Sequence, residues 1–396
     1  MACARKKLAE FVGEGDGYVV VRTPKHGRLL RFTLHGARGV RETREDVRRV
    51  AGHAPAPVAF VGSSNTVLTV AMAESLRDAA AANPGEGPVL LVPWASSVLA
   101  ERSDPGEGPV ALLDVDAGRT FRFCLNNQYM ADLIVKCLGD LEPDLPAKRV
   151  VIVEDRYDPY STDLSACFHR AVERAVPAAE FIEMTVAPPL PLPHDPSLLP
   201  TPAEEAVAES VWRDADRLPH GQTLWVVLPL QEEPTLRMIQ ALSRHARRTL
   251  HAGSSPLRVV CGDAVGASNL ARIAGRCPVP VWCVSSASPE APAKGVSHDV
   301  QIPAEIVASL VRCLDLPGDR PASAGDLRRA LAGMKLAADD PSALGRSLAF
   351  SRSGERVGDD LGHVLMIRPD EASVHFVTRG REGRWRGPTP LAADFP

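Results

Sequence analysis

Three apolar segments of the chain end in small polar residues, a pattern that suits the binding of a small charged molecule. Phe60–Thr66 reads FVGSSNT and leads into a helical pattern, Val92–Ser97 reads VPWASS, and Val260–Gly266 reads VCGDAVG. The first segment places hydroxyl residues at an expected helix N-terminus, where free backbone N–H groups and the helix dipole favour a carboxylate or phosphate. In the third segment, Asp263 ends an apolar strand and is suited to meet an ammonium group.

Each segment also has a purely structural explanation. Ser63 or Ser64 would cap the following helix, and Asp263 would form a turn beside Gly262. Other polar groups are expected to be structural as well, because acidic pairs at helix starts complement the helix dipole and histidines at helix ends are solvated. These groups are Glu204–Glu205, Glu232–Glu233, Asp339–Asp340, His245 and His251.

The sequence lacks the motifs of common enzyme sites. It has no P-loop, no G-x-G-x-x-G after a strand, no G-x-S-x-G and no H-E-x-x-H. Its eight cysteines are scattered without a C-x-x-C pair, which predicts reduced core residues and not a disulfide framework or a zinc site. We therefore predict that the protein is not an enzyme and needs neither a metal nor a cofactor.

Short apolar runs alternate with amphipathic helical patterns along the chain. Most of the runs do not alternate with polar residues, which is typical of strands covered on both faces in a parallel sheet. The predicted strands are residues 18–21, 29–34, 58–62, 89–93, 121–125, 149–155, 181–184, 224–228, 258–262 and 279–285, with shorter ones at 347–350, 363–368 and 373–377. The predicted helices follow Ser64 or cover residues 130–138, 164–175, 236–242 and 306–314. This alternation over 396 residues predicts an α/β architecture with two sheets.

The overall composition is that of an ordinary globular protein. The chain is 45% hydrophobic and 24% charged, with a net charge of −4, which argues against nucleic-acid binding through bulk charge. No apolar run reaches the roughly 18 residues of a membrane span. The N-terminus lacks the apolar region of a signal peptide. We therefore expect a cytoplasmic protein, or a periplasmic or extracellular one if a leader precedes this sequence.

The order of the segments resembles the type I periplasmic-binding proteins, in particular the branched-chain amino-acid receptors of ABC transporters. The likeness runs from about residue 29 to 377 and rests on VAFVGSSNT, VLLVPWASS, RTFRFCLNNQYMADL, RVVIVEDRYDPYSTDLSACF, LRVVCGDAVGASNLARIAG and SALGRSLAFSRSGERVGD. It implies two α/β lobes, each a mostly parallel sheet flanked by helices, joined by three crossovers. The expected ranges are 18–140 with 288–360 for lobe one, 141–287 with 361–396 for lobe two, and 1–17 for an N-terminal tail.

The resemblance also implies a binding site for an amino-acid-like molecule. Carried over by position, Ser63 or Ser64 binds the ligand carboxylate with the backbone at Ala95 and the hydroxyl of Ser96. Asp263 binds the α-ammonium group. Tyr160 takes the place of the aromatic residue in the family's D-D-x-x-Y-G motif, here EDRYDPYS. The predicted ligand-binding set is Ser63, Ser64, Thr66, Ala95, Ser96, Tyr160, Gln231 and Asp263.

Three functions stay open from the sequence. The first is a small-molecule sensing module that acts by lobe closure and passes the signal to an effector. The second is a receptor-like scaffold whose surface makes protein–protein contacts. The third is a transporter receptor whose signal sequence lies outside this chain. A small-molecule ligand and an effector or transporter protein are the expected partners.

The start of the chain departs from the family. The family's opening strand–helix unit is not recognisable, because only about 28 residues precede the predicted strand at Leu29. An incomplete sheet would expose an edge that invites pairing. We therefore predict that Tyr18–Leu34 forms a strand pair covering this edge, or that a partner protein does.

Overall fold

The protein divides into two compact units. The computed structural model describes residues 9–36, 39–63, 65–82, 87–100, 108–143, 147–186, 198–219, 221–249, 256–288, 296, 298–318, 320–340, 343–358, 361–369, 371–379 and 385–390. Unit 1 comprises residues 1–125 and 290–361, and unit 2 comprises residues 126–289 and 362–396. The chain therefore passes between the units three times.

Two boundaries differ from the expected ranges. The first crossing precedes the helix α4 (Asn127–Leu141), whereas the sequence placed it near residue 140. The helix belongs to unit 2 because it packs on the helix α5 (Pro159–Ala175) and on strands of that unit. The expected tail also contains a strand, β1 (Glu10–Gly15).

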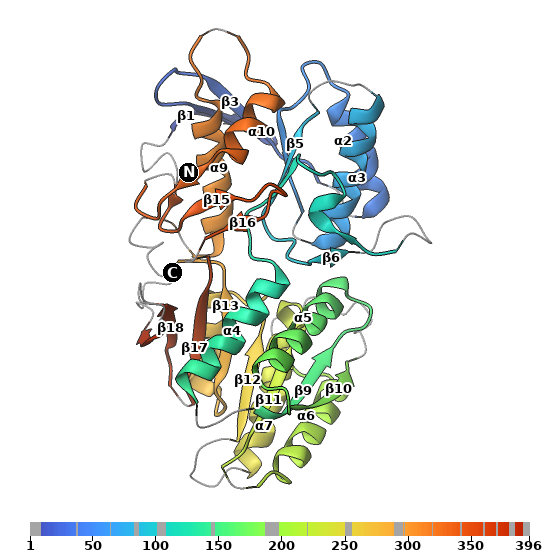
Figure 1. Cartoon of the computed structure of the whole chain (residues 1–396), viewed down its shortest axis with the longest axis vertical. Helices are drawn as coiled ribbons and strands as arrows, with labels where there is room; N and C mark the ends of the chain where they lie inside the picture. The colour runs from blue at the N-terminus through green and yellow to red at the C-terminus, as the bar shows by residue number, and fades with distance from the viewer. Residues whose placement is uncertain are drawn as a thin grey trace. The chain divides into compact units, whose positions relative to one another are not determined.

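Unit 1 is built around a three-stranded parallel sheet in the order β4-β5-β8. Its central strand β5 is labelled in Figure 1. Alternate residues of β5 face opposite sides, because strand side chains have a period of two. Val89 and Leu91 pack with α9 and α10, while Leu90 and Val92 pack with α2 and α3. The elements of this unit after β1 are β2 (Tyr18–Arg22), β3 (Leu29–Thr33), α2 (Val40–Ala51), β4 (Ala59–Val61), α3 (Thr66–Ala82), β5 (Val89–Val92), β6 (Leu99–Ala100), β7 (Val110–Ala111), η1 (Leu112–Asp114), β8 (Thr120–Arg122), η4 (His298–Val300), α9 (Gln301–Leu314), α10 (Ala324–Ala332), β14 (Lys335–Leu336), β15 (Leu348–Phe350) and β16 (Arg356–Val357).

The predicted strand pair at the start of the chain forms, but it does not extend the parallel sheet. β2 and β3 pair with each other and with β1 in a separate antiparallel sheet. Leu30 and Phe32 anchor this sheet on the core formed with α9 and α10. Asp315 holds its turn by accepting hydrogen bonds from the Thr23 hydroxyl at 2.6 Å and from the Lys25 backbone N–H at 2.8 Å.

A buried ionic cluster connects three segments of unit 1. The Glu305 carboxylate of α9 accepts hydrogen bonds at 2.6 Å from Arg346 and from Arg356, and all three side chains are fully buried. Burial alone would raise the pKa of Glu305, but the two guanidinium groups hold it below its ordinary value. Arg356 also donates to the carbonyl of Phe123 just after β8, at 3.1 Å. The cluster therefore fixes the C-terminal part of the unit against its sheet.

Unit 2 contains an eight-stranded sheet in the order β10-β9-β11-β12-β13-β17-β18-β19. The strands from β10 to β13 are parallel, and the last three strands add in antiparallel fashion. Besides α4 and α5, the elements are β9 (Ala147–Glu154), β10 (Glu180–Thr185), α6 (Pro202–Ala215), β11 (Thr223–Leu228), α7 (Glu232–Thr249), β12 (Leu257–Cys261), α8 (Ala267–Ile273), η2 (Ala274–Arg276), β13 (Val281–Ser285), β17 (His363–Ile367), β18 (Val374–Arg379) and β19 (Trp385–Pro390).

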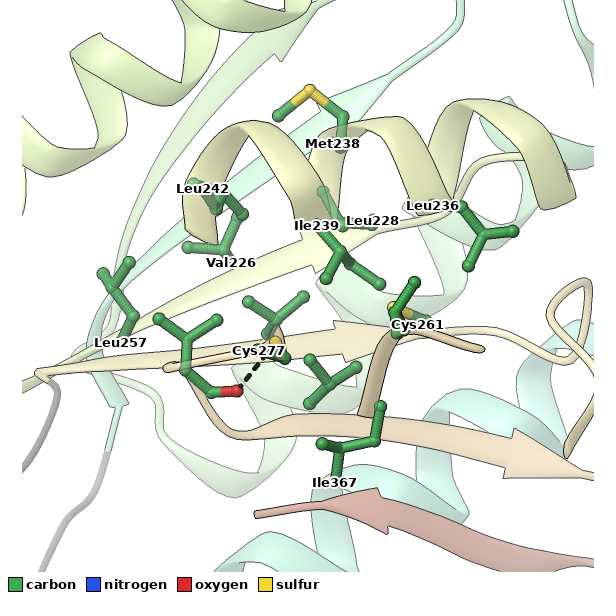
Figure 2. Close-up of a cluster of buried hydrophobic side chains, with 14 of the residues drawn as sticks. Val226, Leu228, Leu236, Met238, Ile239, Leu242, Leu257, Cys261, Cys277 and Ile367 are labelled. Atoms are coloured by element: carbon green, nitrogen blue, oxygen red, sulfur yellow. Dashed lines mark hydrogen bonds between the residues drawn. The ribbon is translucent and has the colours of Figure 1, made fainter. Parts of the chain in front are cut away.

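The core of unit 2 lies between this sheet and the helices α6, α7 and α8. Leu236, Ile239 and Leu242 of α7 pack over strand residues such as Val226 and Leu257 (Figure 2). The strands β11 and β12 are buried at every residue, which explains why their sequences are apolar apart from Thr223 and Arg258. The helices α4 and α5 contact other strands of the sheet.

Every range predicted as a strand overlaps an observed strand, and every predicted helix is present. Among the described α-helices, α2, α8 and α10 were not predicted, and α6 was expected only through the acidic pair at its start. The acidic pairs at residues 204–205 and 232–233 lie at helix starts as expected. The pair Asp339–Asp340 instead lies in a turn after β14, where Asp340 pairs with Arg312 at 3.1 Å. Within the described ranges, no helix is long and apolar enough to span a membrane.

Candidate functional site

The carboxyl edge of the parallel strands in unit 2 gathers several polar residues. The chain runs from β9 to β10 on one side and then to β11 on the other side of β9. This reversal is a topological switch point, where open α/β sheets bind their ligands beyond the carboxyl ends of the strands. Tyr160 follows β9, Gln231 follows β11, Asp263 follows β12 and Ser286 follows β13. Four neighbouring strand ends thus each supply a polar side chain.

Asp263 takes a hydroxyl hydrogen bond on each carboxylate oxygen. The Tyr160 hydroxyl donates to Oδ1 and the Ser286 hydroxyl donates to Oδ2, each at 3.4 Å. Burial raises the pKa of Asp263 to about 6, and the two hydrogen bonds oppose that rise. Both hydrogen bonds are long, so the carboxylate keeps acceptor capacity for a cationic group.

A second contact spans the switch point directly. Asp158 caps α5 by accepting from the Tyr160 backbone N–H at 3.2 Å. Its other oxygen accepts from the Gln231 side chain at 3.0 Å. Burial raises the pKa of Asp158, while the hydrogen bonds from Gln231 and Tyr160 lower it. Gln231 is exposed, and its amide group therefore lies at the rim of this edge.

Gly262 makes room for Tyr160. A Cβ atom at Gly262 would lie 2.4 Å from the Tyr160 hydroxyl oxygen and 2.6 Å from Cδ2 of Leu164. We expect Gly262→Ala to displace the Tyr160 ring and to lower the free energy of unfolding by about 1–3 kcal/mol. In a Tyr160→Phe background the closest contact is gone, so the same substitution should cost about 1 kcal/mol less. Urea unfolding of the four variants measures this coupling, and equal costs in both backgrounds would refute the contact.

Unit 1 presents a similar edge at the carboxyl ends of β4, β5 and β8. Asn65 caps α3, because its Oδ1 accepts from the Leu68 backbone N–H at 2.8 Å. The structural alternative in which Ser63 caps this helix is therefore wrong; its hydroxyl accepts from the Asn65 backbone N–H at 3.4 Å. Ser64 lies outside the described residues. Thr66 is 5% exposed, and its hydroxyl shares a 2.9 Å hydrogen bond with that of Ser97.

The segment after β5 is almost completely buried. Ala95 and Ser96 are each 1% exposed, while Trp94 keeps 43% of its surface. The Ser96 hydroxyl has no hydrogen-bond partner in the part of the chain that the structure describes. A buried polar group without a partner costs free energy, and a ligand oxygen would satisfy it.

Solved structures with a similar fold were found, although no family model and no curated protein sequence matches the chain. An ABC-transporter substrate-binding protein from Desulfitobacterium hafniense in complex with Leu aligns with a TM-score of 0.56, 13% identity, and coverage of 88% of this chain and 85% of that chain. A leucine-, isoleucine-, valine-, threonine- and alanine-binding protein from Brucella ovis aligns with a TM-score of 0.59 and 11% identity, covering 89% and 81%. A solute-binding protein from Rhodopseudomonas palustris HaA2 in complex with p-hydroxybenzoic acid aligns with a TM-score of 0.57 and 13% identity, covering 90% and 84%.

The chain has the fold of the type I periplasmic-binding proteins. This confirms the fold class predicted from the sequence. At these identities the likeness concerns the fold alone. The type I periplasmic-binding-protein fold accounts for the two α/β units and for the three passages of the chain between them.

Within this fold, the predicted residues separate into two groups. Tyr160, Gln231 and Asp263 gather at the carboxyl edge of unit 2. The other described residues of the predicted set lie at the carboxyl ends of β4 and β5 in unit 1: Ser63, Thr66, Ala95 and Ser96. Sequence reasoning missed Asp158 and Ser286. The position of Ser286 directly after the apolar strand β13 was the signal that could have revealed it.

The charged side chains of the described ranges form no group of three or more histidine, cysteine, aspartate or glutamate residues suited to a metal ion. His245, in α7, lies 3.3 Å from Glu205. The described cysteines are free and buried. Burial raises the pKa of Cys313 to about 12, so this thiol stays protonated and unreactive.

Proposed function

We propose that the protein binds a small molecule that carries an ammonium group, with an α-amino acid as the best candidate. The observation that carries this proposal is Asp263, a carboxylate at a switch-point edge whose hydrogen bonds from the Tyr160 and Ser286 hydroxyls are both long. An ammonium group donates up to three hydrogen bonds and pairs with such a carboxylate. The structurally similar protein in complex with Leu supports the choice of an amino acid.

We propose a role in anion binding for the polar edge of unit 1. Its Ser63 and Ser96 hydroxyls and the start of α3 suit a carboxylate. Leu and p-hydroxybenzoic acid, which occupy two structurally similar proteins, share a carboxylate group. The substitution Ser63→Ala tests the role of unit 1 separately from that of Asp263. We expect it to lower the affinity for the ligand less than Asp263→Ala does, because backbone N–H groups still hold the carboxylate.

Substitution of Asp263 is the first test. Each charge-assisted hydrogen bond contributes roughly 1.5–3 kcal/mol, so Asp263→Ala should weaken amino-acid binding about ten- to a hundredfold. Asp263→Asn should weaken it less, because the amide keeps one acceptor oxygen. Isothermal titration calorimetry of a panel of α-amino acids measures both effects. Unchanged affinity in Asp263→Ala would refute the proposal.

The pH dependence gives an independent test of the same carboxylate. Because the pKa of Asp263 is about 6, the group is mostly protonated at pH 5 and mostly ionised at pH 7. Amino-acid affinity should therefore rise about tenfold between these two pH values, and Asp263→Asn should abolish the rise.

The folded protein binds the proton of the Asp263 carboxyl group more tightly than the unfolded chain does. Asp263 therefore favours folding below pH about 4, and this contribution is lost as the pH rises through 6.

We further propose that binding is coupled to closure of the two units and signals to an effector protein. A ligand shifts such an equilibrium only by its difference in affinity for the two states. Small-angle X-ray scattering should then give a smaller radius of gyration when the tightest-binding amino acid is present. An unchanged radius of gyration at saturating ligand would refute the closure step. The protein would then bind its ligand without this signal.

A further inference from the structure

Arg122, the last residue of β8, carries a deeply buried positive charge. Its side chain is 2% exposed. One terminal nitrogen donates to the Ser97 carbonyl at 2.8 Å, and the other donates to the Glu355 carboxylate at 3.2 Å. Its Nε atom is buried and has no acceptor among the described residues. Burying a guanidinium group is costly unless it is paired and its N–H groups are all satisfied.

The contacts of Arg122 tie together the ends of three strands. Through the Ser97 carbonyl it holds the segment after β5, and the Ser97 hydroxyl is hydrogen-bonded to Thr66 at the start of α3. Glu355 adjoins β16 and forms a parallel bridge with Arg122 itself. Ser96 lies next to Ser97 and has the buried hydroxyl without a partner. Arg122 therefore fixes the backbone that positions this hydroxyl.

We propose that Arg122 is a positioning residue for anion recognition in unit 1. It acts through Ser97, which it holds in place so that the Ser96 hydroxyl is oriented for a ligand carboxylate. This inference rests on the proposed function and extends it to a residue that makes no contact with the ligand.

The test compares two probes that differ only at the anionic group, L-leucine and L-leucinamide. If leucine does not bind, the tightest amino acid of the panel and its amide replace them. We expect Arg122→Met to weaken leucine binding about ten- to a hundredfold and leucinamide binding less than threefold. Arg122→Lys keeps the charge but not the planar fork of the guanidinium, so it should recover part of the loss. Arg77→Met is the matched control, because it removes the same charge from a half-exposed pair with Asp78.

Amide hydrogen exchange shows whether each variant is folded. If Arg122→Met does not fold, Arg122→Lys carries the comparison, with a selective loss of about three- to tenfold for leucine. Equal losses for both probes, or no loss for either, would overturn the role of Arg122 while the Asp263 result stands. If the wild-type protein binds no probe at all, the proposed function itself fails, and the role of Arg122 fails with it.

Discussion

Glu305→Gln should destabilise unit 1 by about 3–5 kcal/mol, because it leaves two buried guanidinium groups without their shared counter-charge. Glu305 accepts hydrogen bonds from Arg346 at 2.6 and 3.0 Å and from Arg356 at 2.6 Å. The glutamine side chain keeps the shape but removes the charge, and its amide NH₂ group faces donors. Urea denaturation measures the loss in the free energy of unfolding, and amide hydrogen exchange shows whether α9 is the part that loosens.

Glu209→Gln is the control for this prediction. Glu209 pairs with Arg213 on the surface of α6, and both side chains are about 60% exposed. Exposed pairs of this kind contribute less than about 1 kcal/mol. If Glu305→Gln and Glu209→Gln lower the free energy of unfolding equally, the buried cluster has no special role in stability.

Gly354→Ala should lower the free energy of unfolding nearly as much as Glu305→Gln does, because the added Cβ atom has no room. Gly354 has φ +85°, and a Cβ atom there would lie 1.9 Å from the backbone carbonyl oxygen of Thr120. Its own carbonyl accepts the Arg122 backbone N–H at 2.9 Å. The loop before β16 would have to leave β8, which would cost about 2 kcal/mol or more beyond the left-handed backbone strain of about 1–2 kcal/mol.

Gly318→Ala separates the backbone strain from the clash. Gly318 has φ +86°, and no atom lies within 4 Å of its added Cβ position. Thermal unfolding of the two variants should show a clearly larger loss for Gly354→Ala. An equal drop in Tm for Gly354→Ala and Gly318→Ala would mean that the close approach to Thr120 is unimportant.

The strands were predictable from sequence because burial leaves a direct mark on them. β11 is buried at all of its residues, and after Thr223 it reads as an unbroken apolar run. The helix α2 was not predictable in this way, because only Thr43 and Val47 are buried among its many charged residues. β1 is exposed at most of its positions and shows no apolar pattern. An element that buries few side chains gives little hydrophobic periodicity to detect.

The candidate site was partly predictable for a related reason. Asp263 stands directly after an apolar strand, so its place at the carboxyl edge follows from the strand pattern. Arg122 gave no such signal, because its burial depends on Glu355, which lies 233 residues later in the chain. The capping role of Asn65 was missed because three adjacent polar residues all suit an N-cap, and only the observed helix start at Thr66 selects one.

The most direct test of the proposed function is a calorimetric titration of the panel of α-amino acids into the wild-type protein and Asp263→Ala at pH 7. At a concentration 100 times the Kd, a ligand should also stabilise the wild-type protein by about 2.7 kcal/mol. The proposal predicts saturable binding of at least one amino acid to the wild-type protein and a ten- to hundredfold weaker Kd in Asp263→Ala. Absence of binding, or an equal Kd in both proteins, would contradict it and favour a scaffold that makes protein–protein contacts.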